Sequence, residues 1–350
     1  MKENKSKKQK IALFHPWIKS RGGAERVVLD FLKNTKHKVD VYTWVYDENN
    51  TFEEFGDYNI KVVAPEIARK ISRSYILRGL FLPISMFFSK IPLKYYDKFL
   101  ISSGGLAELI TLRNYKPEET YAYVHTILRA SYKEDMEWNF KYRYKNPLKK
   151  LIYEIAAKTY RIFEKIAWGK IDFPIFNSEL SEKRARKQNL LKNKKTEVVY
   201  PSVNVSDFEK LKNKKGRHFL YVARFGMAKR QLELVRAWKK FVKKYPKEKL
   251  VLVGNKENES YFNKIKKEAE KIENIEIKSN LPQKELDELY ETSKAVLFVP
   301  LMEDFGIVPF EAIACGKPLI AVDEGGYVNL VKKHYKKHTV WINDSKEEKN

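Results

Sequence analysis

The sequence of 350 residues has a single cysteine, a shortage of acidic residues and no long hydrophobic run. One thiol, Cys315, excludes an intramolecular disulfide and a cysteine metal cluster, and the apolar letters AIAC favour a buried structural thiol over a nucleophile. The most apolar window, Ile76–Phe88, contains Arg78 and Pro83 and is shorter than the ~20 residues of a membrane span. The polar start MKENKSKKQK indicates no secretion signal. We therefore expect a cytoplasmic protein without a transmembrane helix.

Several motifs that would define other functions are also missing. The sequence contains no Walker A loop, HExxH zinc motif or GxSxG elbow, and Gly22–Gly23 completes no GxGxxG fingerprint. No two aspartates stand two positions apart, so the Asp-x-Asp motif that holds a nucleotide diphosphate through a divalent metal is absent. A phosphorylated ligand would have to be neutralised by basic side chains instead. We expect no metal and no bound cofactor.

The charge balance is strongly basic, with 69 Lys and Arg against 45 Asp and Glu, a net charge of +24. Such a net positive charge indicates an anionic partner, which could be a nucleic acid, an anionic lipid surface or a phosphorylated small molecule. Between Tyr142 and Lys195 the sequence is helical, basic and aromatic. A solvated helix face beside a packed apolar stripe is the simpler interpretation. Docking onto an anionic membrane surface is the alternative.

The order of the apolar segments predicts two successive α/β series. Buried strands are expected at Ile11–Pro16, Val39–Tyr46, Asn59–Pro65, Lys98–Gly105 and Thr120–His125, and then at His218–Phe225, Leu250–Gly254, Ile275–Asn280 and Ala295–Pro300. This pattern predicts two Rossmann-like, doubly wound domains that face a central cleft, where a ligand would bind. The first covers residues 1–205, with a flexible basic tail at 1–10, and the second covers 206–350; the lysine-rich Glu209–Lys215 is the expected linker.

Two groups of charged residues are candidates for chemistry. Glu303 should lie on the loop after the strand Ala295–Pro300, and Glu311 in the following helix, at the rim where α/β sheets bind ligands. The start of that helix also offers unpaired N–H groups to a phosphate. Arg224 ends a strand and Lys229 opens a helix, so their charges could hold a diphosphate, although surface charge explains either residue equally well.

Four segments in this order resemble the retaining nucleotide-sugar glycosyltransferases of family 4, which have the GT-B fold. They are RGGAER (Arg21–Arg26), YVHTILR (Tyr123–Arg129), VARFGMAKRQLELVRAW (Val222–Trp238) and EDFGIVPFEAIACGKPLIA (Glu303–Ala321). The last contains the family's Glu-x7-Glu signature and is the most specific. Together the four segments span most of the chain.

The resemblance implies roles in the second domain. Glu311 would bind the donor ribose, and Glu303 would hold the transferred sugar beside the developing positive charge. Arg224 and Lys229 would bind the diphosphate and stabilise it as the leaving group. The backbone N–H groups of the next segment would face the distal phosphate or the sugar; they belong to Phe305, Gly306 and Ile307. The leaving phosphate would help to deprotonate the acceptor. Glu303 would not act as a covalent nucleophile.

The resemblance also implies roles in the first domain. His125 would approach the transferred sugar, although a histidine at a strand end is more often structural, and Arg129 would contact substrate. Gly22 and Gly23 would let the first loop close over phosphate or acceptor. The partners implied are a GDP- or UDP-linked sugar, with GDP-mannose preferred, and a lipid-linked or membrane-proximal glycan. The protein would then lie in the cytoplasm or on the inner face of the membrane.

The sequence departs from the family pattern at three places. Asp304 replaces a common glycine, and Ser279–Asn280 stand where a glycine often shapes the base pocket. The family's usual last helices are not expected before Asn350. Two other functions remain open on this basis: a polyanion-binding or nucleic-acid-binding protein, for which no recognised module is found, and a catalytically silent GT-B protein at a membrane.

Overall fold

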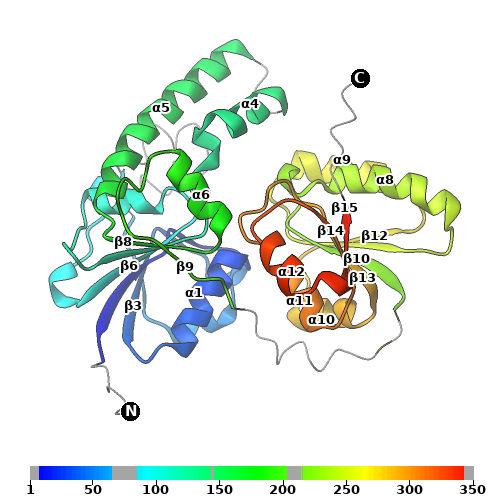
Figure 1. Cartoon of the computed structure of the whole chain (residues 1–350), viewed down its shortest axis with the longest axis horizontal. Coiled ribbons are helices and arrows are strands. Elements are labelled where there is room, and N and C mark those ends of the chain that lie inside the picture. The colour runs from blue at the N-terminus through cyan, green and yellow to red at the C-terminus, as the bar shows by residue number, and fades with distance from the viewer. Residues whose placement is uncertain (1–7, 65–84, 143–145, 203–213, 215, 343–350) are drawn as a thin grey trace. The chain divides into compact units, whose positions relative to one another are not determined.

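A computed structural model of the chain describes residues 8–64, 85–142, 146–202, 214 and 216–342. The chain divides into two compact units, residues 1–202 and 203–350, and each is described here by itself (Figure 1). Most of the predicted tail, the part of the apolar window before Ser85, and the predicted linker except Lys214 lie outside the described residues. No helix among the described segments is both long and apolar enough to cross a membrane.

The first unit is built on a seven-stranded parallel sheet in the order β5-β3-β1-β6-β7-β8-β9. The strands are β1 (Lys10–Phe14), β3 (Lys38–Thr43), β5 (Ile60–Val62), β6 (Lys98–Ser103), β7 (Thr120–Val124), β8 (Phe173–Phe176) and β9 (Glu197–Val198). The helices are α1 (Gly23–Asn34), α4 (Lys133–Tyr142), α5 (Pro147–Gly169) and α6 (Glu179–Lys187). Short 3-10 turns connect them, at 48–50, 53–57, 93–95, 107–112 and 129–131.

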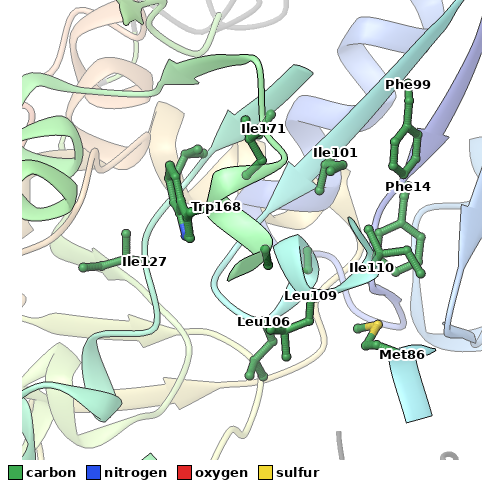
Figure 2. Packing of buried hydrophobic residues seen from close by; sticks show 14 of the residues in the cluster. Phe14, Met86, Phe99, Ile101, Leu106, Leu109, Ile110, Ile127, Trp168 and Ile171 are labelled. Carbon is green, nitrogen blue, oxygen red and sulfur yellow. The ribbon is translucent and has the colours of Figure 1, made fainter. Parts of the chain in front are cut away.

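The core of this unit lies on both faces of the sheet, because central parallel strands are covered on each side. Figure 2 shows one face, where Phe14 of β1 and Phe99 of β6 pack with Ile110 and Met86. Trp168 at the end of α5 closes the same cluster. On the other face, α1 packs through its apolar side in a second cluster. The sheet is therefore fixed from both sides.

The stretch after β1 differs from the expectation. The segment Val39–Tyr46, predicted as one strand, is two: β3 ends at Thr43, and β4 (Val45–Tyr46) pairs in parallel with β2 (Trp17–Ile18). The break between β3 and β4 occurs at the buried Trp44, whose backbone N–H donates to the Pro16 carbonyl at 3.1 Å. The first loop is thus held by its own small ladder.

Helix α5 begins at an Asn146 cap, whose side chain accepts from the N–H groups of the first turn, with proline at the start of the helix. Its inner face is fixed by buried polar groups. The Tyr160 hydroxyl lies within hydrogen-bond distance of Glu108 and, at 3.1 Å, of Glu164, which also accepts from the Tyr132 hydroxyl. Burial, and then the charge of Glu108, raise the pKa of Glu164 to about 8.

The second unit is a six-stranded parallel sheet in the order β12-β11-β10-β13-β14-β15. The strands are β10 (His218–Val222), β11 (Leu250–Val253), β12 (Ile275–Lys278), β13 (Ser293–Phe298), β14 (Leu319–Val322) and β15 (Thr339–Ile342). The helices are α8 (Gln231–Lys244), α9 (Glu259–Ala269), α10 (Gln283–Glu291), α11 (Val308–Ala314) and α12 (Val328–His334), with 3-10 turns η6 (Met227–Lys229) and η7 (Lys336–His338). Two apolar clusters cover the two faces. The predicted fold class of two parallel-sheet α/β domains is confirmed.

Cys315 is fully buried in the cluster beside α11, as the sequence indicates for a structural thiol. The helix predicted from Lys229 begins later: Lys229 closes the 3-10 turn η6, and Arg230, in the left-handed region at φ 55°, separates it from α8. Likewise, β10 ends at Val222, before Arg224. Both changes put these basic residues on loop backbone.

We predict that Gly254→Ala destabilises the second unit. A Cβ at Gly254 would lie 1.9 Å from the Ala223 carbonyl oxygen and 2.6 Å from its carbon, and backbone cannot yield cheaply. The expected loss is about 1–3 kcal/mol of unfolding free energy, measured by denaturant or thermal unfolding. Gly56→Ala is the matched control, because nothing lies within 4 Å of its Cβ. Equal midpoints for the two variants would contradict the prediction.

Candidate active site

In the second unit, the loops that follow two neighbouring strands meet at the carboxyl edge of the sheet. Strand β10 lies beside β13, and the Leu301 N–H after β13 donates to the Ala228 carbonyl in η6 at 2.7 Å. This contact brings Lys229 to Glu303: Nζ donates to Oε2 at 2.5 Å, with side chains 17% and 26% exposed. An ammonium and a carboxylate predicted from separate motifs therefore form one ion pair.

Arg224 has a different carboxylate partner. Its Nη1 lies 3.8 Å from Glu257 Oε2, and its side chain is 55% exposed. Its backbone is fixed, because the buried Gln231 donates from Nε2 to the Arg224 carbonyl at 2.8 Å. Arg224 and Lys229, which were expected to act together, therefore lie close in sequence but pair with different carboxylates.

The loop after Glu303 is held by tight packing. Gly306 has φ 86°, in the left-handed region that glycine favours, and a Cβ there would lie 2.9 Å from the Phe298 ring. Phe305 is buried and stacks on Phe310, with ring centroids 5.1 Å apart. Ile307 stands at the N-cap of α11. The backbone from Phe305 to Ile307 is therefore preorganised.

Glu311 lies in α11 and is oriented by a buried phenol. The Tyr290 hydroxyl donates to Glu311 Oε2 at 2.6 Å, and Tyr290 is fully buried. Burial, together with the Glu311 charge, raises the pKa of Tyr290 well above its usual value, so the phenol remains a donor. Sequence reasoning did not identify Tyr290, since a tyrosine in α10 reads as an ordinary core residue.

A second glycine loop at this edge was also missed. Glu324 follows β14, lies 3.4 Å from Arg230 Nη1, and accepts from the Met302 N–H at 3.3 Å. The Gly326 N–H donates to the Glu303 carbonyl at 2.9 Å, and Gly325 has φ 124°. Two glycines in the loop after a buried strand were the available signal, the same signal that singled out Gly22–Gly23.

In the first unit, His125 is one end of a buried chain of three side chains. His125 Nε2 lies 2.8 Å from Ser102 Oγ, which lies 2.9 Å from His15 Nδ1. Burial, and then the charge of His15, lower the pKa of His125 to about 3, and burial lowers that of His15. Both imidazoles are neutral near pH 7. The single Ser102 hydroxyl can donate to only one of them, so their tautomers are coupled.

The first glycine loop packs closely against an acid. A Cβ at Gly22 would lie 2.4 Å from Glu25 Oε2, and Ser20 Oγ donates to Glu25 Oε1 at 2.6 Å. Gly23 is the first residue of α1. The Glu25 charge raises the pKa of His15, against the larger effect of burial, which connects this loop electrostatically to the histidine chain.

Arg129 forms a bidentate ion pair rather than an open basic site. Its Nε lies 2.8 Å from Asp135 Oδ2, and its Nη2 donates to Oδ1 at 3.2 Å. An anionic substrate would have to compete with this carboxylate.

Comparison with known proteins finds a family match for the second unit. Residues 203–349 match the family model for glycosyl transferases group 1. Across nearly the whole chain, the sequence is similar to alpha-1,3/1,6-mannosyltransferase ALG2: 25% identical to the Kluyveromyces lactis protein, covering 95% of this chain and 73% of that protein, and 24% identical to the mouse protein, covering 90% and 80%.

Solved structures show the same fold. Sucrose-phosphate synthase from Thermosynechococcus elongatus superposes with a TM-score of 0.68 at 17% identity, over 97% of this chain and 86% of that one. Anabaena HepE in complex with UDP-glucose gives a TM-score of 0.64 at 17% identity, over 96% and 85%. The segment with Lys229, Glu303 and Glu311 lies within the residues that the family model matches. The second unit therefore carries a glycosyl transferases group 1 domain, and the chain has the fold of GT-B glycosyltransferases.

Proposed function

We propose that this protein is a retaining glycosyltransferase that moves a hexose, with mannose preferred, from a nucleotide-diphosphate sugar to a lipid-linked or membrane-proximal glycan. The observation that carries the proposal is the Lys229–Glu303 ion pair on loops at the carboxyl edge of a parallel sheet, with Glu311 in the helix that follows. The similarity to alpha-1,3/1,6-mannosyltransferases over most of the chain supports mannose as the transferred hexose. The donor nucleotide is GDP or UDP, with GDP preferred.

In this proposal, different residues of the second unit bind different parts of the donor. Lys229 and Arg224 hold the diphosphate, and their positive charges neutralise it as the glycosidic bond breaks. Two cations supply the charge that a metal would otherwise bring, so the reaction needs no divalent ion. Glu311, aligned by Tyr290, accepts hydrogen bonds from the ribose hydroxyls, and Glu303 bears on the sugar. The backbone N–H groups of Phe305, Gly306 and Ile307 face the distal phosphate or sugar.

The first unit contributes a neutral imidazole. Since its pKa is lowered to about 3, His125 stays uncharged and can exchange hydrogen bonds with a sugar hydroxyl without repelling a developing cation. Ser102 and His15 fix its position and tautomer. Gly22 and Gly23 in the first loop and Arg129 after β7 serve substrate binding.

Helix α5 gives the proposal of a membrane-proximal acceptor its physical basis. Leu148, Leu151, Ile155, Ile162 and Ile166 recur at helical spacing on α5, and each is about half exposed or more. Lysines and an arginine accompany this stripe. An aliphatic stripe beside basic residues suits an anionic membrane surface.

We expect Lys229→Ala and Glu311→Ala to weaken binding of the donor about 10- to 100-fold, because each removes charge-assisted hydrogen bonds of about 1.5–3 kcal/mol. Titration calorimetry with GDP-mannose and UDP-glucose measures the effect. Lys240→Ala, an exposed lysine on α8, is the matched control and should bind as the parent does. A screen of GDP- and UDP-sugars for hydrolysis and for protection against melting identifies the donor. Saturable binding that is unchanged in both variants would refute the assigned site.

Tyr290→Phe tests the role of Glu311. Without the phenol hydroxyl, the carboxylate loses its 2.6 Å partner, and the KM for the donor should rise several-fold while kcat changes little. That pattern is expected of a residue that binds the ribose equally in the ground and transition states. A fall in kcat at constant KM would show instead that Glu311 acts on the transition state.

Replacing Leu151 and Ile155 by glutamate should weaken binding to anionic vesicles by at least about tenfold, since burying one such side chain contributes about 1.5–3 kcal/mol. Flotation with phosphatidylglycerol-containing liposomes at moderate salt measures this. Val340→Glu, which changes an exposed apolar residue of the second unit (61% exposed), is the control and should float as the parent does. No flotation of the parent protein would count against the membrane surface.

A further inference from the structure

Two residues with unusual backbone conformation flank the Lys229–Glu303 ion pair. Arg230 follows Lys229 directly and has φ 55°. Met302 precedes Glu303 directly and has φ 46°. For a residue with a side chain this left-handed region is costly, because Cβ approaches the following carbonyl oxygen. Asn280 is the one other non-glycine residue with positive φ in the described part of the second unit, and asparagine tolerates that conformation better. The strained positions of this unit are therefore concentrated at the ion pair.

One carboxylate contacts both strained positions. Glu324 Oε1 accepts from the Met302 N–H at 3.3 Å and lies 3.4 Å from Arg230 Nη1. The three residues come from the segments after β14, β13 and β10, which are neighbouring strands of the sheet, so three segments meet at one oxygen atom. Backbone in a costly conformation persists only where its surroundings fix it. Glu324 supplies such a constraint to both turns.

Glu324 itself lies on a loop that is well fixed. Tyr327 is fully buried, and its hydroxyl donates to the Val322 carbonyl at 2.5 Å. The Gly326 N–H donates to the Glu303 carbonyl at 2.9 Å. The first hydrogen bond closes the loop on itself, and the second ties it to the segment after β13. The loop after β14 is therefore a rigid support against which the other two segments are held.

An ordinary surface ion pair would not explain this arrangement. Exposed pairs of opposite charge contribute little to stability, because water and salt screen them. The side chains of Arg230 and Glu324 are only 24% and 20% exposed. Those of the Lys229–Glu303 pair are removed from water to a similar degree. A carboxylate that accepts from a backbone N–H as well as from a guanidinium also fixes the backbone, which two flexible side chains alone do not.

We propose that Glu324 is a positioning residue of the donor site, which holds the two left-handed turns that present Lys229 and Glu303 to the donor. The inference rests on the proposed function, because the donor is what these two side chains would contact. Glu324 acts through the Met302 N–H and the Arg230 guanidinium, not through contact with phosphate or sugar. Small displacements of charged groups at a reaction centre reduce affinity and rate steeply, so the turns have to be held accurately.

Titration of the full chain with GDP-mannose and with UDP-glucose tests this role. Glu324→Ala should weaken binding of whichever donor the parent binds by about 5- to 20-fold, because both turns lose their acceptor. Glu324→Gln keeps an acceptor oxygen for the Met302 N–H and should lose less. Asp323→Ala is the matched control. It removes the neighbouring carboxylate of the same loop, whose partner is Lys332 at 2.6 Å, and should bind as the parent does.

A glycine background separates positioning from a loss of stability. Glycine adopts left-handed backbone at no steric cost, so in the Arg230→Gly/Met302→Gly background the turns no longer depend on the carboxylate. Adding Glu324→Ala there should change donor binding by less than about twofold. A carboxylate that only stabilises the fold would lower the unfolding midpoint and leave donor affinity unchanged well below that midpoint. That result, or a full effect of Glu324→Ala in the glycine background, would overturn the proposal.

Hydrogen exchange followed by mass spectrometry examines the two turns without any donor. Amide exchange in the segments 226–231 and 300–306 should be faster in Glu324→Ala than in the Asp323→Ala control. Unchanged exchange together with parent-like donor binding would refute the positioning role and leave the proposed function intact. Faster exchange in a protein that binds neither nucleotide sugar would support Glu324 as the residue that holds the turns and refute the proposed function.

Discussion

All parallel strands of a sheet present their carboxyl ends at the same edge, and this constraint generates the candidate site in each unit. In the second unit it places the turn after β10 beside the loop after β13, which allows Lys229 to reach Glu303. In the first unit, β1, β6 and β7 are neighbours, so His15, Ser102 and His125 form one chain of hydrogen bonds. Residues distant in sequence meet because of sheet topology alone.

The Lys229–Glu303 ion pair indicates how the proposed donor would enter. Both side chains are mostly removed from water, and each would be costly to bury without an opposite charge. A diphosphate carries more negative charge than one carboxylate, so it can compete for the ammonium. In the proposed reaction, binding therefore exchanges one partner of Lys229 for another and turns Glu303 toward the sugar. The rigid loop from Phe305 to Ile307 needs no rearrangement for this exchange.

The sequence predicted those parts of the fold and site that local patterns encode. Buried strands such as Leu250–Val253 are short apolar runs, and Glu303 comes a few residues after another such run, so its loop position could be inferred. The β2–β4 ladder could not, since two-residue strands have no periodicity and the break depends on burial of Trp44. His15 and Tyr290 were missed for a similar reason. Each is an ordinary residue in its own segment, and only the tertiary contact with His125's partner or with Glu311 gives it a role.

Helix α5 combines three surfaces that follow from different forces. Its inner face packs in the core, its outer face keeps aliphatic side chains in contact with solvent, and a row of cations lies along one flank. Glu164 connects the first surface to the third. Because its folded pKa is raised above the unfolded value, the buried neutral carboxyl stabilises the fold at low pH, and this contribution is lost as the pH rises from about 4.5 through about 8. Near neutral pH the carboxyl is mostly protonated and adds little negative charge beside Arg161. The core of the unit thereby sets the electrostatics of its surface.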